Sequence, residues 1–151
     1  MSRITPRILW IGAALVVAAC MKKEEPATAE VSVSITAPAE GDTIRDSAVH
    51  ITLGATGIEI APAADARPET AHHHLYLDTD VPTGEVPIPM GVPGVVHLGM
   101  AQTEYHWENV TPGPHRIIAV LADPGHIPLK PLVTDTVNIV VVAPADSTTK
   151  K

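Results

Sequence analysis

Alternation of apolar and polar residues with a period of two is the feature that most constrains the fold of this chain. The alternation runs through residues 31–36 and 49–53 and returns in residues 133–142. A period of two turns one face of an extended strand toward a core, whereas an amphipathic helix needs apolar residues every three to four positions. Because no segment shows the helical period, the sequence predicts β-strands.

Further strands are predicted at residues 72–78, 102–107 and 116–123. The last of these is an almost continuous apolar run, which is typical of a central strand buried on both faces. Clusters of proline and glycine punctuate the chain, including a loop of about a dozen residues at 82–94 that is rich in both. The pattern predicts an all-β, Ig-like antiparallel β-sandwich of about seven strands over residues 31–142, with a small barrel as the alternative architecture.

The N-terminus has the features of a lipoprotein signal peptide. Two arginines precede an apolar run at residues 8–19, which is too short to span a bilayer comfortably. The sequence Val-Ala-Ala-Cys ending at Cys20 resembles the bacterial lipobox, in which the cysteine is lipidated and becomes the new N-terminus. An ordinary signal peptide followed by an incidental cysteine is the alternative. The predicted segments are residues 1–19 as signal peptide, 20–30 as lipidated tether, 31–142 as the sandwich and 143–151 as a flexible C-terminal tail.

Charge narrows the choice of partners. After removal of the signal peptide, eight basic residues remain of the chain's ten, against seventeen acidic ones. An acidic domain with no basic run argues against nucleic acid and against electrostatic docking on anionic lipid. Membrane attachment then falls to the lipid on Cys20, which places the protein in the cell envelope. Met21, where a retained inner-membrane lipoprotein carries aspartate, favours the outer membrane of a Gram-negative host.

Three consecutive histidines, His72, His73 and His74, begin the segment richest in potential chemistry. In a strand, His73 shares one face with the leucines that follow, while His72 and His74 share the other. The leucines require a core, so we expect His73 at the core margin and the other two facing outward. Side chains at such positions start about 7 Å apart, close enough for both to bind one ion.

A metal site is one interpretation of these histidines. Imidazole nitrogens suit both Zn²⁺ and Cu²⁺, and three or four ligands suffice. Met90 and Met100 flank His97, and thioether ligands would favour Cu(I). The candidate ligands are His72 and His74, joined by His97 or His126 from a loop.

A structural role is the competing interpretation. Buried polar groups need hydrogen-bond partners, and a network of histidine, acid and amide side chains can attach loops to a sandwich without any ligand. His115, beside Pro-Gly-Pro, could fix a corner in this way. The residues expected either in this network or in orienting metal ligands are His73, Asp78, Gln102, Glu104, His115 and Asp123.

Catalysis has the least support. The predicted domain has no cysteine, no serine in a Gly-x-Ser-x-Gly turn, no HExxH and no phosphate-binding glycine loop. We therefore expect a non-enzymatic binding or accessory role in the cell envelope. The alternatives are a Cu- or Zn-binding lipoprotein and a histidine-assisted hydrolase. An envelope protein or a glycan is a further candidate partner, with the 82–96 loop as its contact surface.

Four blocks carry a family resemblance: Ala71–Asp80 (AHHHLYLDTD), His97–Glu104 (HLGMAQTE), Pro112–His115 (PGPH) and Leu121–Pro128 (LADPGHIP). In this order they resemble the bacterial family filed as domain of unknown function 4399. Its members typically read GHHHLLIDTD, HFGxGQTE, PGxHTLxLxLGD and HxPHxPP.

This chain departs from the family pattern at two positions. Leu98 stands where phenylalanine is usual, and Leu129 stands where a further histidine is common. The second departure weakens any metal site that would need that histidine. The resemblance implies homology over roughly residues 31–142 and implies no activity.

Overall fold

A computed structural model describes residues 30–143. The predicted signal peptide and Cys20, and nearly all of the predicted tether and tail, lie outside this range. Within it the chain forms nine β-strands and no helix, so no helix in the described part could span a membrane. The strands are β1 (Ser32–Ala37), β2 (Thr43–Ile44), β3 (Val49–Thr56), β4 (Glu59–Ile60), β5 (Thr70–Leu77), β6 (Val95–Leu98), β7 (Glu104–Trp107), β8 (Gly113–Ala122) and β9 (Thr134–Val141).

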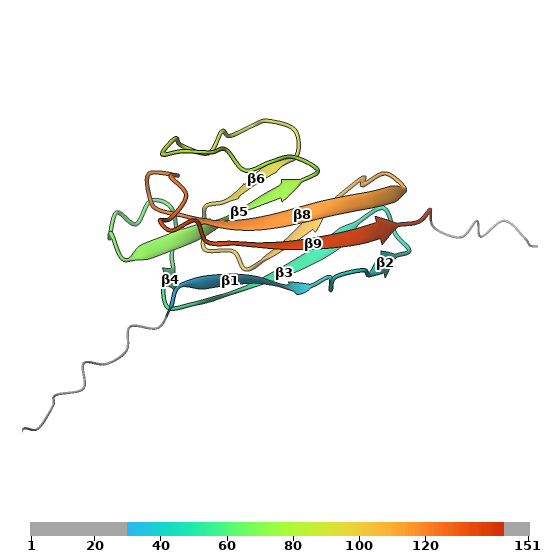
Figure 1. Cartoon of the computed structure of the whole chain (residues 1–151), viewed down its shortest axis with the longest axis horizontal. Coiled ribbons are helices and arrows are strands. Elements are labelled where there is room, and N and C mark those ends of the chain that lie inside the picture. The colour runs from blue at the N-terminus through green and yellow to red at the C-terminus, as the bar shows by residue number, and fades with distance from the viewer. Residues whose placement is uncertain (1–29, 144–151) are drawn as a thin grey trace, which may run out of the picture.

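The strands form two sheets packed face to face (Figure 1). The smaller sheet has the order β1-β3-β7, and the larger has the order β2-β9-β8-β5-β4, with β6 also paired to β5. All pairings are antiparallel except the two made by the two-residue strands β2 and β4. The predicted all-β, Ig-like sandwich is confirmed, and the seven strands longer than two residues match the expected number.

The main core lies between the sheets and follows the predicted alternation. In β3, Val49 and Ile51 are fully buried while His50 between them is exposed. Strand β8 differs because both of its faces are buried, as its continuous apolar run predicts. Leu75 of β5 and Ile117 of β8 belong to the core between the sheets.

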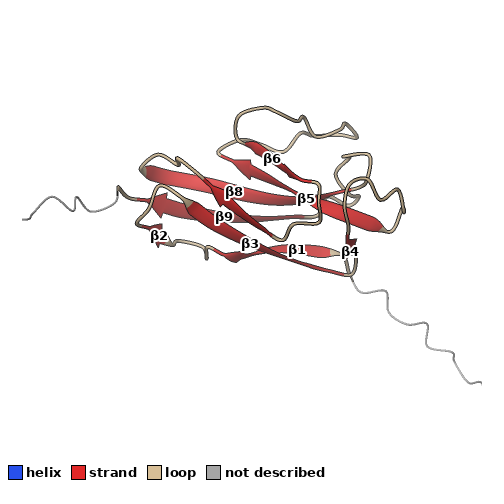
Figure 2. Cartoon of the chain, turned by 180° about the vertical axis from the view of Figure 1, so that it is seen from behind, coloured by secondary structure: helices blue, strands red, loops and turns tan. Residues whose placement is uncertain are grey.

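A second apolar cluster lies on the outer face of the larger sheet. It consists of Tyr76, Ile118, Val120 and Ala122 from β5 and β8, together with Ile88 from the loop that joins β5 to β6. Figures 1 and 2 show this loop arching over the larger sheet on the side away from β1 and β3. The outer face of β5 and β8 is therefore covered rather than exposed to solvent.

This cover corrects one prediction. His72 and His74 do share a face, as expected, but they are 1% and 0% exposed instead of facing solvent. The proline-rich loop folds back and inserts Ile88 over the sheet, a tertiary contact to which no local pattern in the sequence points. His73 points to the opposite face as predicted, where its Nδ1 lies 3.2 Å from the carbonyl oxygen of Gln102.

Candidate metal centre

Strand register brings a third histidine beside the first two. The antiparallel pairing of β6 with β5 sets His97 directly opposite His74. Directly paired residues of antiparallel strands project from the same side of a sheet. His97 therefore lies with His72 and His74 on the covered outer face.

A tight turn after β8 supplies the fourth histidine. Asp123 closes the turn: its carboxylate accepts from the backbone N–H of Ile127 at 2.9 Å, and its carbonyl accepts from that of His126 at 2.9 Å. His126 has a φ of 65°, an uncommon value for a residue with a side chain. Its own carbonyl accepts a 2.8 Å hydrogen bond from the N–H of Ile88, which ties the turn to the covering loop.

The imidazole rings of His72, His74, His97 and His126 pack against one another on all sides. The six distances between ring centroids range from 4.7 to 5.9 Å. The Nε2 atoms of His72 and His74 are 3.0 Å apart, and His97 contributes a nitrogen so that one atom from each of the three lies within 4.8 Å of the others. The ring of His126 lies 4.7 Å from that of His97 and closes the cluster, although its nitrogens fall outside the group of three.

These spacings can be compared with those of a tetrahedral metal site. Zinc binds imidazole nitrogen at about 2.0–2.1 Å, which puts a ring centre about 3.2 Å from the ion and neighbouring ring centres about 5.2 Å apart. The observed range of 4.7 to 5.9 Å brackets that value. The backbone therefore groups four rings at metal-site spacing, and three of them, His72, His74 and His97, already place a nitrogen each within 4.8 Å of the others.

Burial favours the uncharged form of three of these rings, those of His72, His74 and His97. Desolvation, reinforced by the neighbouring histidines, lowers the pKa of His72 to about 4 and the pKa of His74 to about 3. Burial also lowers the pKa of His97, with His126 contributing. A neutral imidazole has one nitrogen with a free lone pair, so these rings are in the protonation state that a metal ion requires at neutral pH.

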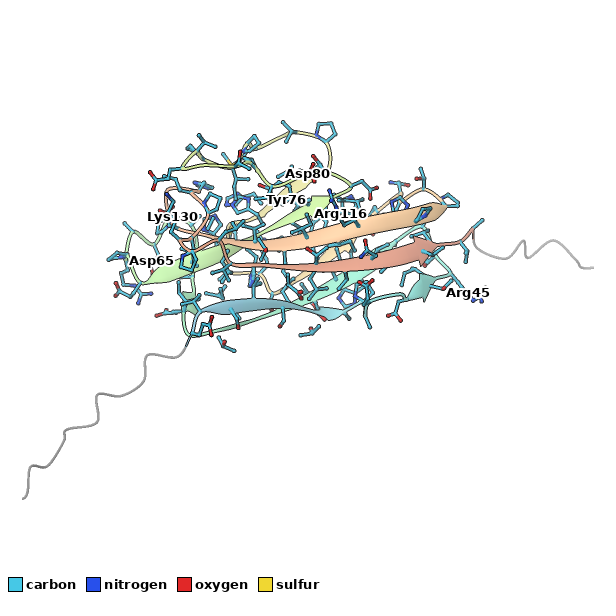
Figure 3. All side chains as sticks on the ribbon, in the orientation of Figure 1. Arg45, Asp65, Tyr76, Asp80, Arg116 and Lys130 are labelled. Carbon is cyan, nitrogen blue, oxygen red and sulfur yellow. The ribbon has the colours of Figure 1, made fainter. Side chains whose placement is uncertain are left out.

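Several polar atoms of this face have no hydrogen-bond partner among the described residues. They include Nδ1 of His74, the Nε2 atoms of His97 and His126, and the hydroxyl of Tyr76. Tyr76, labelled in Figure 3, follows His74 on the same face of β5, and burial raises its pKa to about 12. Buried polar groups are normally paired, so a ligand bound on this face would satisfy atoms that the described residues leave unpartnered.

Gly99 is a residue of the candidate site that the sequence reasoning missed. A Cβ atom built on Gly99 would lie 2.2 Å from Cε1 and 2.4 Å from Nε2 of His97, so the His97 ring rests directly over this glycine. Any side chain at position 99 would displace the ring. A glycine two positions after a strand histidine, hence on the same face, is the signal that could have found it.

The two methionines that flank His97 in the sequence have exposed side chains. Met90 is 63% exposed and Met100 is 77% exposed, whereas His72 and His74 are fully buried. The backbone N–H of Met100 donates to Oε1 of Gln102 at 2.7 Å, and this bond steadies the segment that follows His97. The argument for Cu(I) from thioether ligands therefore loses its support.

His115 and Asp78 form a separate corner, in keeping with the structural interpretation. His115 Nδ1 lies 2.6 Å from Oδ2 of Asp78, and its Nε2 lies 2.6 Å from the carbonyl oxygen of Thr111. Both partners are acceptors, so both ring nitrogens donate and the imidazole is a cation. Burial opposes this charge, but the hydrogen bonds and the Asp78 carboxylate raise the pKa of His115. Nearby, Arg116 pairs with Asp80 at 2.6 Å (Figure 3).

This corner predicts a pH dependence of stability. A raised folded-state pKa stabilises the protein fully below the unfolded value of about 6.5 and ceases to do so as pH rises through the folded value. Urea unfolding of wild type and His115→Gln should therefore show a stability gap that narrows by about 1–2 kcal/mol from pH 5.5 to pH 9. His106→Gln, an exposed control, should show no such trend. A gap that widened with pH would contradict the assignment of a cationic His115.

Glu104 is the predicted network residue that lies apart from the others. Its side chain is 68% exposed and reaches His50, at 3.4 Å from Nε2, on the outer face of the smaller sheet. Asp123 and Gln102 instead hold the segments that carry His126 and His97.

The sequence block that contains the cluster also carries the family match. The profile of a family described as "Domain of unknown function (DUF4399)" matches residues 51–142. The chain belongs to the DUF4399 family. The matched segment holds all four clustered histidines and Gly99. No curated protein matches the DUF4399 chain in a sequence comparison.

Solved structures with a similar fold share little sequence with the DUF4399 chain. An engineered protein is 11% identical with a TM-score of 0.48, covering 77% of this chain and 21% of its own. Fibronectin(III)-like modules of Clostridium thermocellum CbhA are 20% identical with a TM-score of 0.46, covering 74% and 97%. The PKD domain of human KIAA0319 is 12% identical with a TM-score of 0.38, covering 80% and 88%. The DUF4399 chain thus spans about a fifth of the engineered chain, and these likenesses concern the fold alone.

Proposed function

We propose that this DUF4399 protein binds a transition-metal ion, zinc or copper, in the cell envelope. One observation carries the proposal: the buried residues His72 and His74 and the half-buried His97 present nitrogens within 4.8 Å of one another. A fourth ring, that of His126, packs against them. The role is binding rather than catalysis, and the lipid predicted on Cys20 would hold the domain at the membrane.

A purely structural cluster is the weaker explanation. Hydrogen bonds should then pair the ring nitrogens, but among these four described histidines one such hydrogen bond joins two rings, that of His72 with His74 at 3.0 Å. The Nε2 atoms of His97 and His126 are buried without a partner among the described residues. Each such atom costs about 1–3 kcal/mol of stability, so a purely structural network with these unpaired atoms would destabilise the fold. A metal ion accepts the same lone pairs and removes that cost.

The donor set defines the class of ion. Imidazole nitrogens suit zinc and copper, whereas calcium and magnesium are bound by oxygen. The four rings contain no oxygen, and the acid that acts electrostatically on His72, Asp123, already accepts the N–H of Ile127. The site therefore favours a borderline transition metal over a hard cation.

Calorimetric titration of the full-length chain in detergent with Zn²⁺ and Cu²⁺ tests the proposal. We expect one tight equivalent in wild type and its loss in His97→Gln, which removes a ligand at the less buried side of the cluster. His106→Gln, which changes an exposed histidine on the other sheet, should keep the tight equivalent. Equal binding by wild type and His97→Gln, or no tight binding by wild type, would sink the proposal.

A further inference from the structure

We propose a second, surface metal site formed by His50 and His106 on the smaller sheet. His50 of β3 and His106 of β7 are directly paired across the two antiparallel strands. Both are exposed, and their neighbours Val49 and Tyr105 turn inward toward the core. The two imidazoles therefore stand side by side on the outer face of the β1-β3-β7 sheet.

The two rings are held in a parallel arrangement. Their centroids lie 4.1 Å apart and their planes differ by 5°. Glu104, the next outward-facing residue on β7, places Oε2 3.4 Å from Nε2 of His50. Two nitrogen donors and a carboxylate thus share one small area of the sheet surface.

This spacing is close to what a bound ion needs. Two imidazole nitrogens that bind one zinc ion at about 2.0–2.1 Å lie about 3–3.5 Å apart. The ring centroids are 4.1 Å apart but the planes are parallel, so both side chains must rotate to point their nitrogens at one ion. Both are exposed, so these rotations need no backbone movement. The carboxylate of Glu104 supplies negative charge beside them, and water completes the coordination.

The ion is again Zn²⁺ or Cu²⁺, because both accept mixed imidazole and carboxylate ligands. His50 is 48% exposed, so its ion exchanges directly with solvent and is held more weakly than one in the buried cluster. The buried cluster lies on the outer face of the other sheet, and packed sheets are separated by about 10 Å. The two sites are therefore independent, and this proposal does not rest on the first.

Titration of the full-length chain in detergent with Cu²⁺, followed by calorimetry and electron paramagnetic resonance, distinguishes the sites. In wild type we expect one equivalent of Cu²⁺ to bind weakly at the surface site, in addition to any equivalent that binds tightly at the buried cluster. The double variant His50→Gln/His106→Gln should lose the weaker equivalent and keep its melting temperature, since both positions are exposed. Glu104→Gln should weaken it roughly tenfold. Glu108→Gln, an exposed glutamate that follows β7, is the matched control and should change nothing.

The outcomes separate the two proposals. Absence of the weaker equivalent in wild type, or its persistence in the double variant, overturns the surface site. His97→Gln should leave the weaker equivalent in place, so failure of the buried site and failure of the surface site give different patterns.

Discussion

Replacing Gly99 by alanine is expected to weaken metal binding roughly 100-fold, the upper end of what loss of a residue that orients a ligand costs. The new Cβ would occupy the space of the His97 ring, 2.2 Å from its Cε1 atom. A side chain can rotate away, so the fold survives while the ring leaves the cluster. Calorimetry with Zn²⁺ measures the affinity, and a melting curve reports the fold.

Gly54→Ala is the matched control. Its Cβ would come 2.9 Å from the hydroxyl oxygen of Ser34, which can also rotate away, but Gly54 lies on the smaller sheet. This variant should bind metal as wild type does. Unchanged zinc affinity in Gly99→Ala would mean that His97 is not a ligand.

Zinc in excess is expected to raise the melting temperature of the full-length chain by roughly 10 °C. An ion that binds only the folded state at 100 times its dissociation constant stabilises it by about 2.7 kcal/mol. A domain of this size gains about 4 °C or more for each kcal/mol. The melting temperature should rise because one ion would link β5, β6 and the turn at His126. Without the ion, these three segments are held together by protein contacts alone.

Two comparisons make this measurement specific. Mg²⁺ at the same concentration should leave the melting temperature unchanged, since it prefers oxygen ligands. His97→Gln should remove most of the zinc effect. An equal rise with both ions, or a full rise in the variant, would point to nonspecific binding instead.

Sequence patterns predicted those features of the fold that depend only on neighbouring residues of the same strand. The face shared by His72 and His74 follows from the period of a strand. The double burial of β8 follows from its uninterrupted apolar run. In both cases the residues that neighbour each position within the same strand are enough to predict which face is buried.

The rest of the site depends on contacts between distant segments. Strand β6 has only four residues, too few for a periodic signal, yet its register alone sets His97 opposite His74. The burial of the cluster depends on Ile88, which a loop of prolines and glycines brings over the sheet. His126 reaches the cluster because its backbone adopts a left-handed conformation. Glycine is the usual residue in that conformation, so a histidine at this position gives no sequence signal for it.

The position of the four rings also bears on when the proposed ion would bind during folding. They lie on the face of β5 opposite to Leu75, which belongs to the core between the sheets, so that core is complete without them. Small zinc domains, by contrast, unfold when their metal is removed. We therefore expect this domain to fold before the proposed ion binds, so that the ion would be a late addition or a cargo and not the nucleus around which the chain assembles.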